Sequence, residues 1–126
     1  MSILLDAGPL IALERGNRMV GRRIHSARQS GISLKTHGGV IAQVWRGGTR
    51  EQTRLARALR AVETVQLGED LGRRAGMLLA RCGLSDAIDA ALVAMADHGD
   101  EIITSDPDDL VVLVAASQRS INIIPL

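Results

Sequence analysis

Short apolar runs alternate with longer helical segments along the whole chain, and this alternation constrains the fold more than any other feature. The apolar runs have the length of β-strands, and strands are predicted at residues 2–6, 32–36, 62–67, 101–105 and 120–124. Helices are predicted from Pro9 to the stop at Gly16 and over residues 18–29, 40–46, 49–61, 69–82, 86–98 and 107–117. Such alternation is typical of a parallel sheet with helices on both faces. We therefore predict an α/β fold with a central, mainly parallel sheet of about five strands flanked by helices. The strand order stays open.

Polar residues and glycines mark the expected helix ends. Thr49, with Gln52 three residues later, forms a capping-box pattern at the start of the fourth helix. Ser85 is predicted to cap the sixth helix, and Gly83 and Gly99 are predicted to end the fifth and sixth.

Length and composition exclude several classes of protein. The chain has 126 residues, which predicts one domain over residues 1–126, and its 46% hydrophobic content excludes a disordered chain. No apolar run approaches the roughly 20 residues of a membrane span. The first apolar stretch lacks a basic leader and is interrupted by Asp6 and Pro9, so no signal peptide is expected. Cys82 is the single cysteine, which excludes an internal disulfide. We expect a soluble, cytoplasmic protein.

The net charge of +1 hides a strong asymmetry along the chain. Residues 15–81 hold thirteen arginines and one lysine against four acids, a balance of +10. Residues 82–126 hold one arginine against eight acids, a balance of −7. A basic section beside an acidic one within a small fold needs a physical explanation.

Four arginines of the basic section are candidates for phosphate binding. Arg50, Arg54 and Arg57 share one face of the predicted fourth helix, and Arg46 precedes it. Two interpretations stay open, namely a solvated arginine-rich surface and guanidinium groups that position RNA phosphates beside an acidic site. Trp45 is the single aromatic residue, so stacking of bases on aromatic side chains is nearly excluded.

Carboxylates follow two of the predicted strands and lie on one helix. Asp6 follows the first strand, Asp106 and Asp109 follow the fourth, and Asp89 lies three residues after Asp86 on the sixth helix. The structural alternative is that these acids only cap helices. If they converge, their repulsion raises their pKa values unless a cation neutralises them. Oxygen ligands suit Mg²⁺ or Mn²⁺ rather than zinc, and such an ion activates water and clamps a phosphodiester.

The segments around these acids carry a family resemblance. They read ILLDAGPLIAL over residues 3–13, SDAIDAALVA over residues 85–94 and TSDPDDL over residues 104–110. In order and spacing they resemble the opening strand and acidic turn, the central acidic helix and the closing strand-and-turn of the PIN-domain ribonucleases. The kind most similar is the VapC-like toxin of type II toxin–antitoxin pairs, and the similarity spans essentially the whole chain.

This resemblance implies a PIN-like three-layer α/β fold and a metal-dependent endoribonuclease. It implies that Asp6, Asp89 and Asp106 bind Mg²⁺ or Mn²⁺ and that Asp109 has a supporting catalytic role. It also implies an RNA substrate, a small antitoxin partner that blocks the acidic cleft, and a homodimer.

One position departs from the family pattern. Residues 40–47, VIAQVWRG, match a helix in which the family usually has a glutamate, and Gln43 stands there instead. An amide coordinates through its oxygen or orients water, but it brings no negative charge. We expect Gln43 to face the acidic site and metal affinity to be weaker than in the family.

Two rival functions follow from the sequence. The first is a catalytically weakened or inactive PIN-fold scaffold that binds RNA or an antitoxin, which Gln43 favours. The second is a phosphoacceptor receiver domain, which needs an acceptor aspartate after the third strand and a late lysine. The third predicted strand has no aspartate and Lys35 is the only lysine, so the sequence disfavours the receiver.

Overall fold

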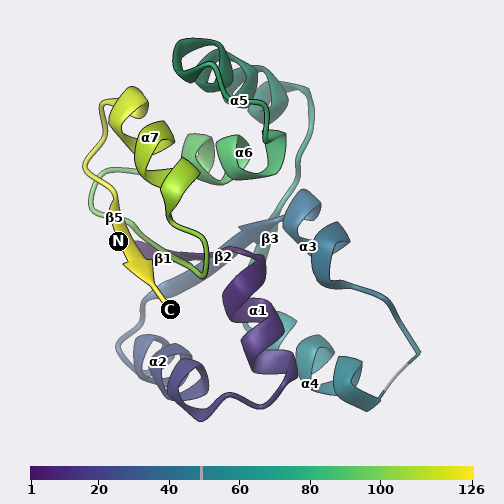
Figure 1. Ribbon diagram of the computed structural model, residues 1–126. Coiled ribbons are helices and arrows are strands. Elements are labelled where there is room, and N and C mark those ends of the chain that lie inside the picture. Colours follow the sequence, from purple (N-terminus) through teal and green to yellow (C-terminus); the bar gives the residue numbers. More distant parts are fainter. Residues whose placement is uncertain (49) are drawn as a thin grey trace.

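A parallel five-stranded sheet forms the middle layer of the computed structural model, which describes residues 1–48 and 50–126 (Figure 1). Its strands are β1 (Ser2–Leu5), β2 (Ser33–His37), β3 (Glu63–Val65), β4 (Glu101–Thr104) and β5 (Asn122–Pro125). They lie in the order β3-β2-β1-β4-β5, and every neighbouring pair is parallel. Since β1 is central, Leu4 is paired with Lys35 of β2 on one side and with Ile102 of β4 on the other.

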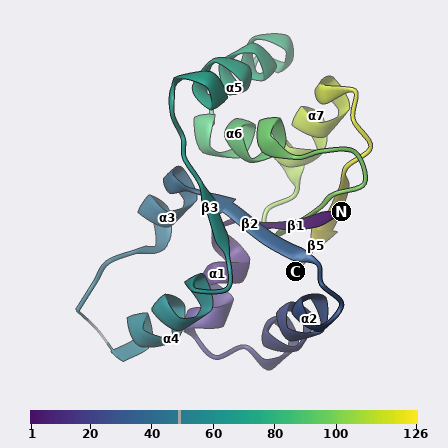
Figure 2. The same ribbon diagram turned by 180° about the vertical axis from the view of Figure 1, so that it is seen from behind.

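Seven helices within the described residues cover the two faces of this sheet. They are α1 (Ala7–Glu14), α2 (Arg18–Gln29), α3 (Gly38–Val44), α4 (Arg50–Leu59), α5 (Glu69–Cys82), α6 (Ala87–Met95) and α7 (Asp108–Ser117). Helices α5, α6 and α7 lie over one face, and α1, α2 and α4 lie over the other (Figures 1 and 2). The predicted α/β class, with helices on both faces of a parallel sheet, is confirmed.

Two hydrophobic cores follow from the alternation of side chains along the strands. Leu4 and Ile102 point into the core beneath α5, α6 and α7. Ile3, Leu5 and Ile103 point into the core shared with α1 to α4. Strands buried on both faces need continuous apolar runs, which is why β1 and β4 stood out in the sequence.

Several predicted element ends differ from those observed. The third strand is shorter than residues 62–67, and α6 ends at Met95 rather than at residue 98. The α6 cap is Asp86 rather than Ser85, since its Oδ1 accepts the N–H groups of Ile88 and Asp89 at 3.0 and 3.1 Å. The predicted cap at Thr49 lies outside the described residues.

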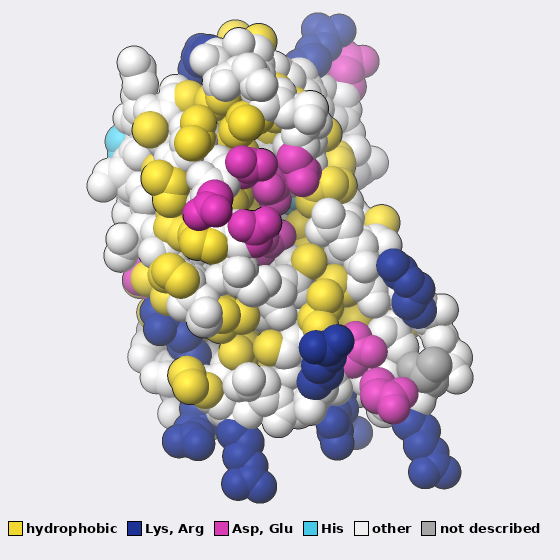
Figure 3. Space-filling view, in the orientation of Figure 1, with side chains coloured by type: hydrophobic (Ala, Val, Ile, Leu, Met, Phe, Trp, Pro, Cys, Tyr) yellow, Lys and Arg dark blue, Asp and Glu magenta, His cyan; other side chains and the backbone are white. Residues whose placement is uncertain are grey.

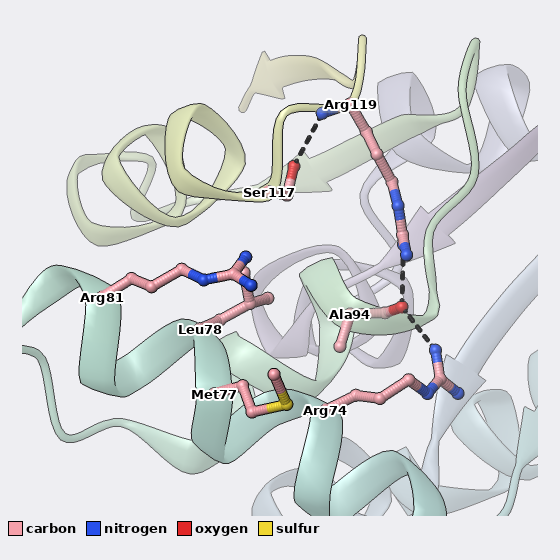
Figure 4. Close-up of a pocket in the computed structure, with 7 residues that line it drawn as sticks. All are labelled: Arg74, Met77, Leu78, Arg81, Ala94, Ser117 and Arg119. Atoms are coloured by element: carbon pink, nitrogen blue, oxygen red, sulfur yellow. Dashed lines mark hydrogen bonds between the residues drawn. The ribbon is translucent and has the colours of Figure 1, made fainter.

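Two arginines hold the C-terminal end of α6 (Figure 4). Arg74 of α5 and Arg119 donate to the carbonyl oxygen of Ala94 at 2.8 and 3.0 Å, and Arg119 also donates to that of Ala96 at 2.6 Å. Cations at a helix C-terminus satisfy its unpaired carbonyl groups and oppose its dipole. The same two arginines line a cavity of about 150 Å³, and their position there is explained by helix capping.

A search of the described residues finds no helix with the length and apolar character needed to cross a membrane.

Candidate functional site

Asp6 connects the central strand β1 directly to α1, and two hydrogen bonds fix its side chain. The residue is 8% exposed. Its Oδ1 accepts the N–H of Ala7 at 2.8 Å and so caps α1, while its Oδ2 accepts the hydroxyl of Thr104 at 2.8 Å. The capping interpretation of Asp6 is therefore confirmed, because Oδ1 serves the helix. Oδ2 faces the end of β4, and the role of Asp6 in a site stays a prediction.

Thr104 joins Asp6 to the second acidic segment. It is fully buried at the end of β4, and its hydroxyl accepts the N–H of Asp106 at 3.0 Å while donating to Asp6. Neighbouring parallel strands β1 and β4 end at the same edge of the sheet, which is where open α/β sheets place ligands. Asp106 and Asp109, the latter in the first turn of α7, are exposed at this edge.

Asp89 completes an acidic cluster, defined here as Asp6, Asp86, Asp89, Asp106 and Asp109. Asp89 lies half-buried in the first turn of α6. Burial, and then repulsion from the carboxylates of the other four members, raises the pKa of Asp89 from 3.8 to about 7. Acidic side chains gather in one patch on this face of the molecule (Figure 3). Residues over eighty positions apart thus share one anionic surface.

The chemistry of this cluster fits a hard divalent cation, although the side chains form no closed cage. Among residues 1–48 and 50–126, no three His, Cys, Asp or Glu side chains are placed to hold a metal ion. Mg²⁺ keeps several water ligands and binds proteins through one or two carboxylates, so it needs no such cage. The donor set consists of carboxylate oxygens, which Mg²⁺ and Mn²⁺ prefer.

His37 is a buried polar residue beside the acidic cluster. The sequence did not indicate a role for it. Its Nδ1 accepts the N–H of Gly39 at 3.0 Å, so its Nε2 carries the proton donated to the carbonyl of Ile88 at 2.9 Å. Burial lowers the pKa of His37 and keeps the ring neutral. His37 therefore ties the start of α3 to the residue preceding Asp89. The sequence offered one signal for His37. It directly precedes Gly38, a position from which its side chain can cap the helix α3.

Gln43 is exposed and lines a cavity between α1, α3 and α4. This Gln43 cavity, of about 370 Å³, is also lined by Glu14, Arg15, Arg46 and Glu51. Gln43 follows Gly39 by one helical turn, and a Cβ on Gly39 would lie 2.5 Å from Ile88 Cδ1. The side of α3 that carries Gly39 therefore faces α6. The expectation that Gln43 faces the acidic cluster stays a prediction.

The four predicted RNA-binding arginines lie in different surroundings. Arg46 lines the Gln43 cavity and donates to the carbonyls of Ala42 and Trp45 at 3.2 and 2.7 Å. Arg54 and Arg57 line a different cavity, of about 340 Å³, near α2. Arg50 is exposed at the start of α4.

Arg15 is an exposed cation just beyond the end of α1 and lines two cavities. It lines the Gln43 cavity on one side of α1 and, on the other side, a cavity of about 540 Å³ that includes Gly8 and Ser105. We refer to the latter as the Ser105 cavity. A Cβ on Gly8 would lie 2.7 Å from Ser105 Cβ, so only glycine permits this approach. In the sequence, Arg15 is one of thirteen arginines of the basic section, and no spacing distinguishes it.

Solved structures share this fold, among them VapBC2 and PAE2754. VapBC2 from Rickettsia felis, solved bound to a DNA fragment from their promoter, matches with a TM-score of 0.73 and 12% identity over 98% of this chain and 99% of that chain. PAE2754 from Pyrobaculum aerophilum matches with a TM-score of 0.62 and 17% identity over 97% of this chain and 83% of that chain. No family model and no curated protein matches the sequence. At these identities the likeness shows the fold, and the predicted PIN-like three-layer architecture is confirmed.

Proposed function

We propose that this chain is a Mg²⁺- or Mn²⁺-dependent endoribonuclease of the VapC-like kind. The acidic cluster carries the proposal, because it gathers carboxylates from three distant segments on one surface, and carboxylates that repel one another are stabilised by a bound cation. The pKa of Asp89, raised by burial and then by this repulsion, agrees with it. The fold shared with VapBC2 supports the same proposal, and the cluster lies at the ends of β1 and β4, the edge at which open α/β sheets place ligands.

In the proposed mechanism, Asp6, Asp89 and Asp106 would hold the cation together with its water ligands. When bound there, the ion supplies an activated water and neutralises charge on the phosphodiester. Thr104 orients Asp6 by donating to its Oδ2, and the same hydroxyl positions the backbone of Asp106. These two contacts reduce the reorganisation needed on binding.

Two further residues have supporting roles in this proposal. Asp109 is the carboxylate that supports the ion or accepts a second one. The amide of Gln43 orients water or substrate without adding a negative charge to the cluster.

The proposal also includes a cellular role as a toxin and the partners that such a role requires. A PIN-like nuclease of this size fits the toxin of a toxin–antitoxin pair, with a small antitoxin that covers the acidic cluster. The fold shared with VapBC2, a protein solved on DNA from its own promoter, supports such a pair. We propose a homodimer acting on RNA in the cytoplasm.

Cleavage of fluorescent single-stranded RNA with Mn²⁺, with Mg²⁺ and with EDTA tests this function. We expect cleavage with either ion, none in EDTA, and none from Asp6→Asn, whose single amide oxygen accepts one of the two hydrogen bonds that the Asp6 carboxylate accepts. Asp97→Asn is the matched control, because Asp97 is an exposed acid at the other end of α6. Equal cleavage by wild type and Asp6→Asn would place the activity elsewhere or in a contaminant.

A non-catalytic scaffold is the second candidate, and Gln43 is the observation that favours it. The family's glutamate is replaced by an exposed amide, which lowers the negative charge available to a cation. This alternative predicts RNA or antitoxin binding by wild type with no cleavage in Mn²⁺.

A further inference from the structure

The Ser105 and Gln43 cavities lie on the two sides of α1 and share part of their walls. Ile11 and Arg15 line both cavities, so the exposed side of α1 forms the ridge between them. The Ser105 cavity begins beside the acidic cluster, because Gly8 is two residues from Asp6 and Ser105 precedes Asp106. A path thus leads from the acidic cluster, over Arg15, into the Gln43 cavity.

Among the residues that line this path, Arg15 is the cation best placed to attract a polyanion. The acidic cluster repels a phosphate backbone, so a polyanion needs a cation close by. Arg15 and Arg46 are the basic residues lining these two cavities. Arg46 already donates to two carbonyls. Over the described part of the chain, the Arg15 side chain makes neither a hydrogen bond nor an ion pair, and the residue is exposed.

We propose that Arg15 binds a backbone phosphate of single-stranded RNA and that the adjoining nucleotide enters the Gln43 cavity. The inference rests on the proposed nuclease function and names where its substrate lies. A guanidinium group matches the geometry of a phosphate with two parallel hydrogen bonds. Arg15 is nine residues from Asp6, about 13 Å along the helix at 1.5 Å per residue. It is therefore a positioning residue, remote from the phosphate that is cut.

The walls of the Gln43 cavity suit an unstacked base. Its volume of about 370 Å³ lies within the range of small-ligand sites. Glu14, Gln43 and Glu51 offer carboxylate and amide oxygens, which accept hydrogen bonds from the N–H groups on a base edge. Sequence-specific proteins read splayed-out bases of single-stranded RNA in this way. No aromatic platform is needed.

Binding of a short fluorescent single-stranded RNA, measured by anisotropy in EDTA in the Asp6→Asn background, tests the role of Arg15 without cleavage. We expect Arg15→Ala to weaken Kd about tenfold, as for loss of one charged hydrogen-bonded contact. We expect the slope of log affinity against log salt to fall by about 0.7. Arg15→Lys keeps the charge and should keep the slope. Arg18→Ala is the matched control, since Arg18 is exposed nearby and lines neither cavity.

The proposal is overturned if Arg15→Ala binds with the Kd and salt slope of Arg18→Ala, or if Arg15→Lys loses the slope as Arg15→Ala does. Failure of the proposed nuclease function would give a different result. RNA binding would then still depend on Arg15, but the wild-type protein would cut no RNA in Mn²⁺.

Discussion

Replacing Asp89 by asparagine tests the electrostatic argument for the site directly. The pKa of Asp89 is about 7 in the folded protein against an ordinary 3.8, so the folded state holds the proton more tightly than the unfolded chain. The stabilisation is therefore complete below pH 3.8 and lost as the pH rises through about 7. The gap of about three pKa units between the folded and the unfolded state corresponds to a contribution of Asp89 to the free energy of unfolding of at most about 4 kcal/mol.

The measurable part of this energy is smaller. Asp89 is half-buried, solvent screens its neighbours, and part of the loss has already occurred at about pH 5. Between about pH 5 and about pH 8, wild type in EDTA should lose about 1 kcal/mol relative to Asp89→Asn. Urea unfolding of both proteins at the two pH values measures the difference.

Comparison with a variant is necessary because a second group titrates in the same window. Burial lowers the pKa of His37, so its contribution to stability increases with pH, with the opposite sign. Wild type and Asp89→Asn share His37, and their difference isolates Asp89. Asp97→Asn should keep the wild-type pH dependence. Parallel curves for wild type and Asp89→Asn would refute the argument that burial and the neighbouring carboxylates raise the pKa of Asp89.

Three further predictions concern the same surroundings. Mn²⁺ at about 100 times its Kd should stabilise wild type by about 2.7 kcal/mol, and Asp6→Asn should lose most of this gain in thermal unfolding. Thr104→Val should cost about 1–3 kcal/mol in urea unfolding and weaken Mn²⁺ binding measured by calorimetry. Thr36→Val, which removes a 2.8 Å bond from an equally buried hydroxyl to Leu5, should destabilise without changing Mn²⁺ affinity. Gly39→Ala should cost about 1–3 kcal/mol because its Cβ meets Ile88 and His37, whereas Gly38→Ala, with nothing within 4 Å, should be tolerated. Equal stability of the two glycine variants would contradict the close approach of α3 to α6.

The sheet could be predicted from the sequence because its strands are buried on both faces. The central residues of β1 and β4, such as Ile3, Leu4, Ile102 and Ile103, are apolar and buried, and this leaves a clear signal. The acids at their ends were visible for the same reason, since they interrupt that signal at the edge where ligands bind.

Element ends and the order of strands were less predictable because local signals compete. Ser85 and Asp86 are both good caps, and the structure uses Asp86 because its carboxylate reaches the N–H groups of Ile88 and Asp89. Helix α6 stops at Met95, and the turn beyond it is held by Asp100, whose carboxylate accepts the N–H groups of Ser2 and Asp97. The contact between Ser2 and Asp100 spans most of the chain, so no local pattern reveals it.

Arg15 and His37 escaped prediction for a different reason. Their significance depends on what lies beside them in the fold, namely two cavities for Arg15 and the carbonyl of Ile88 for His37. A motif search weighs residue types at fixed spacing, whereas these contacts join segments far apart in the chain. Only the tertiary arrangement distinguishes Arg15 from the other exposed arginines.

The separation of acidic and basic sections along the chain has a consequence for how such a nuclease would work. The acidic cluster repels RNA, and one divalent cation neutralises only part of its charge. Affinity for RNA must therefore come from arginines outside the cluster, while the carboxylates serve the cation. Binding should then respond steeply to salt and weakly to the metal, whereas cleavage should require the metal at any salt concentration. Under this division RNA affinity and cleavage rate can change independently.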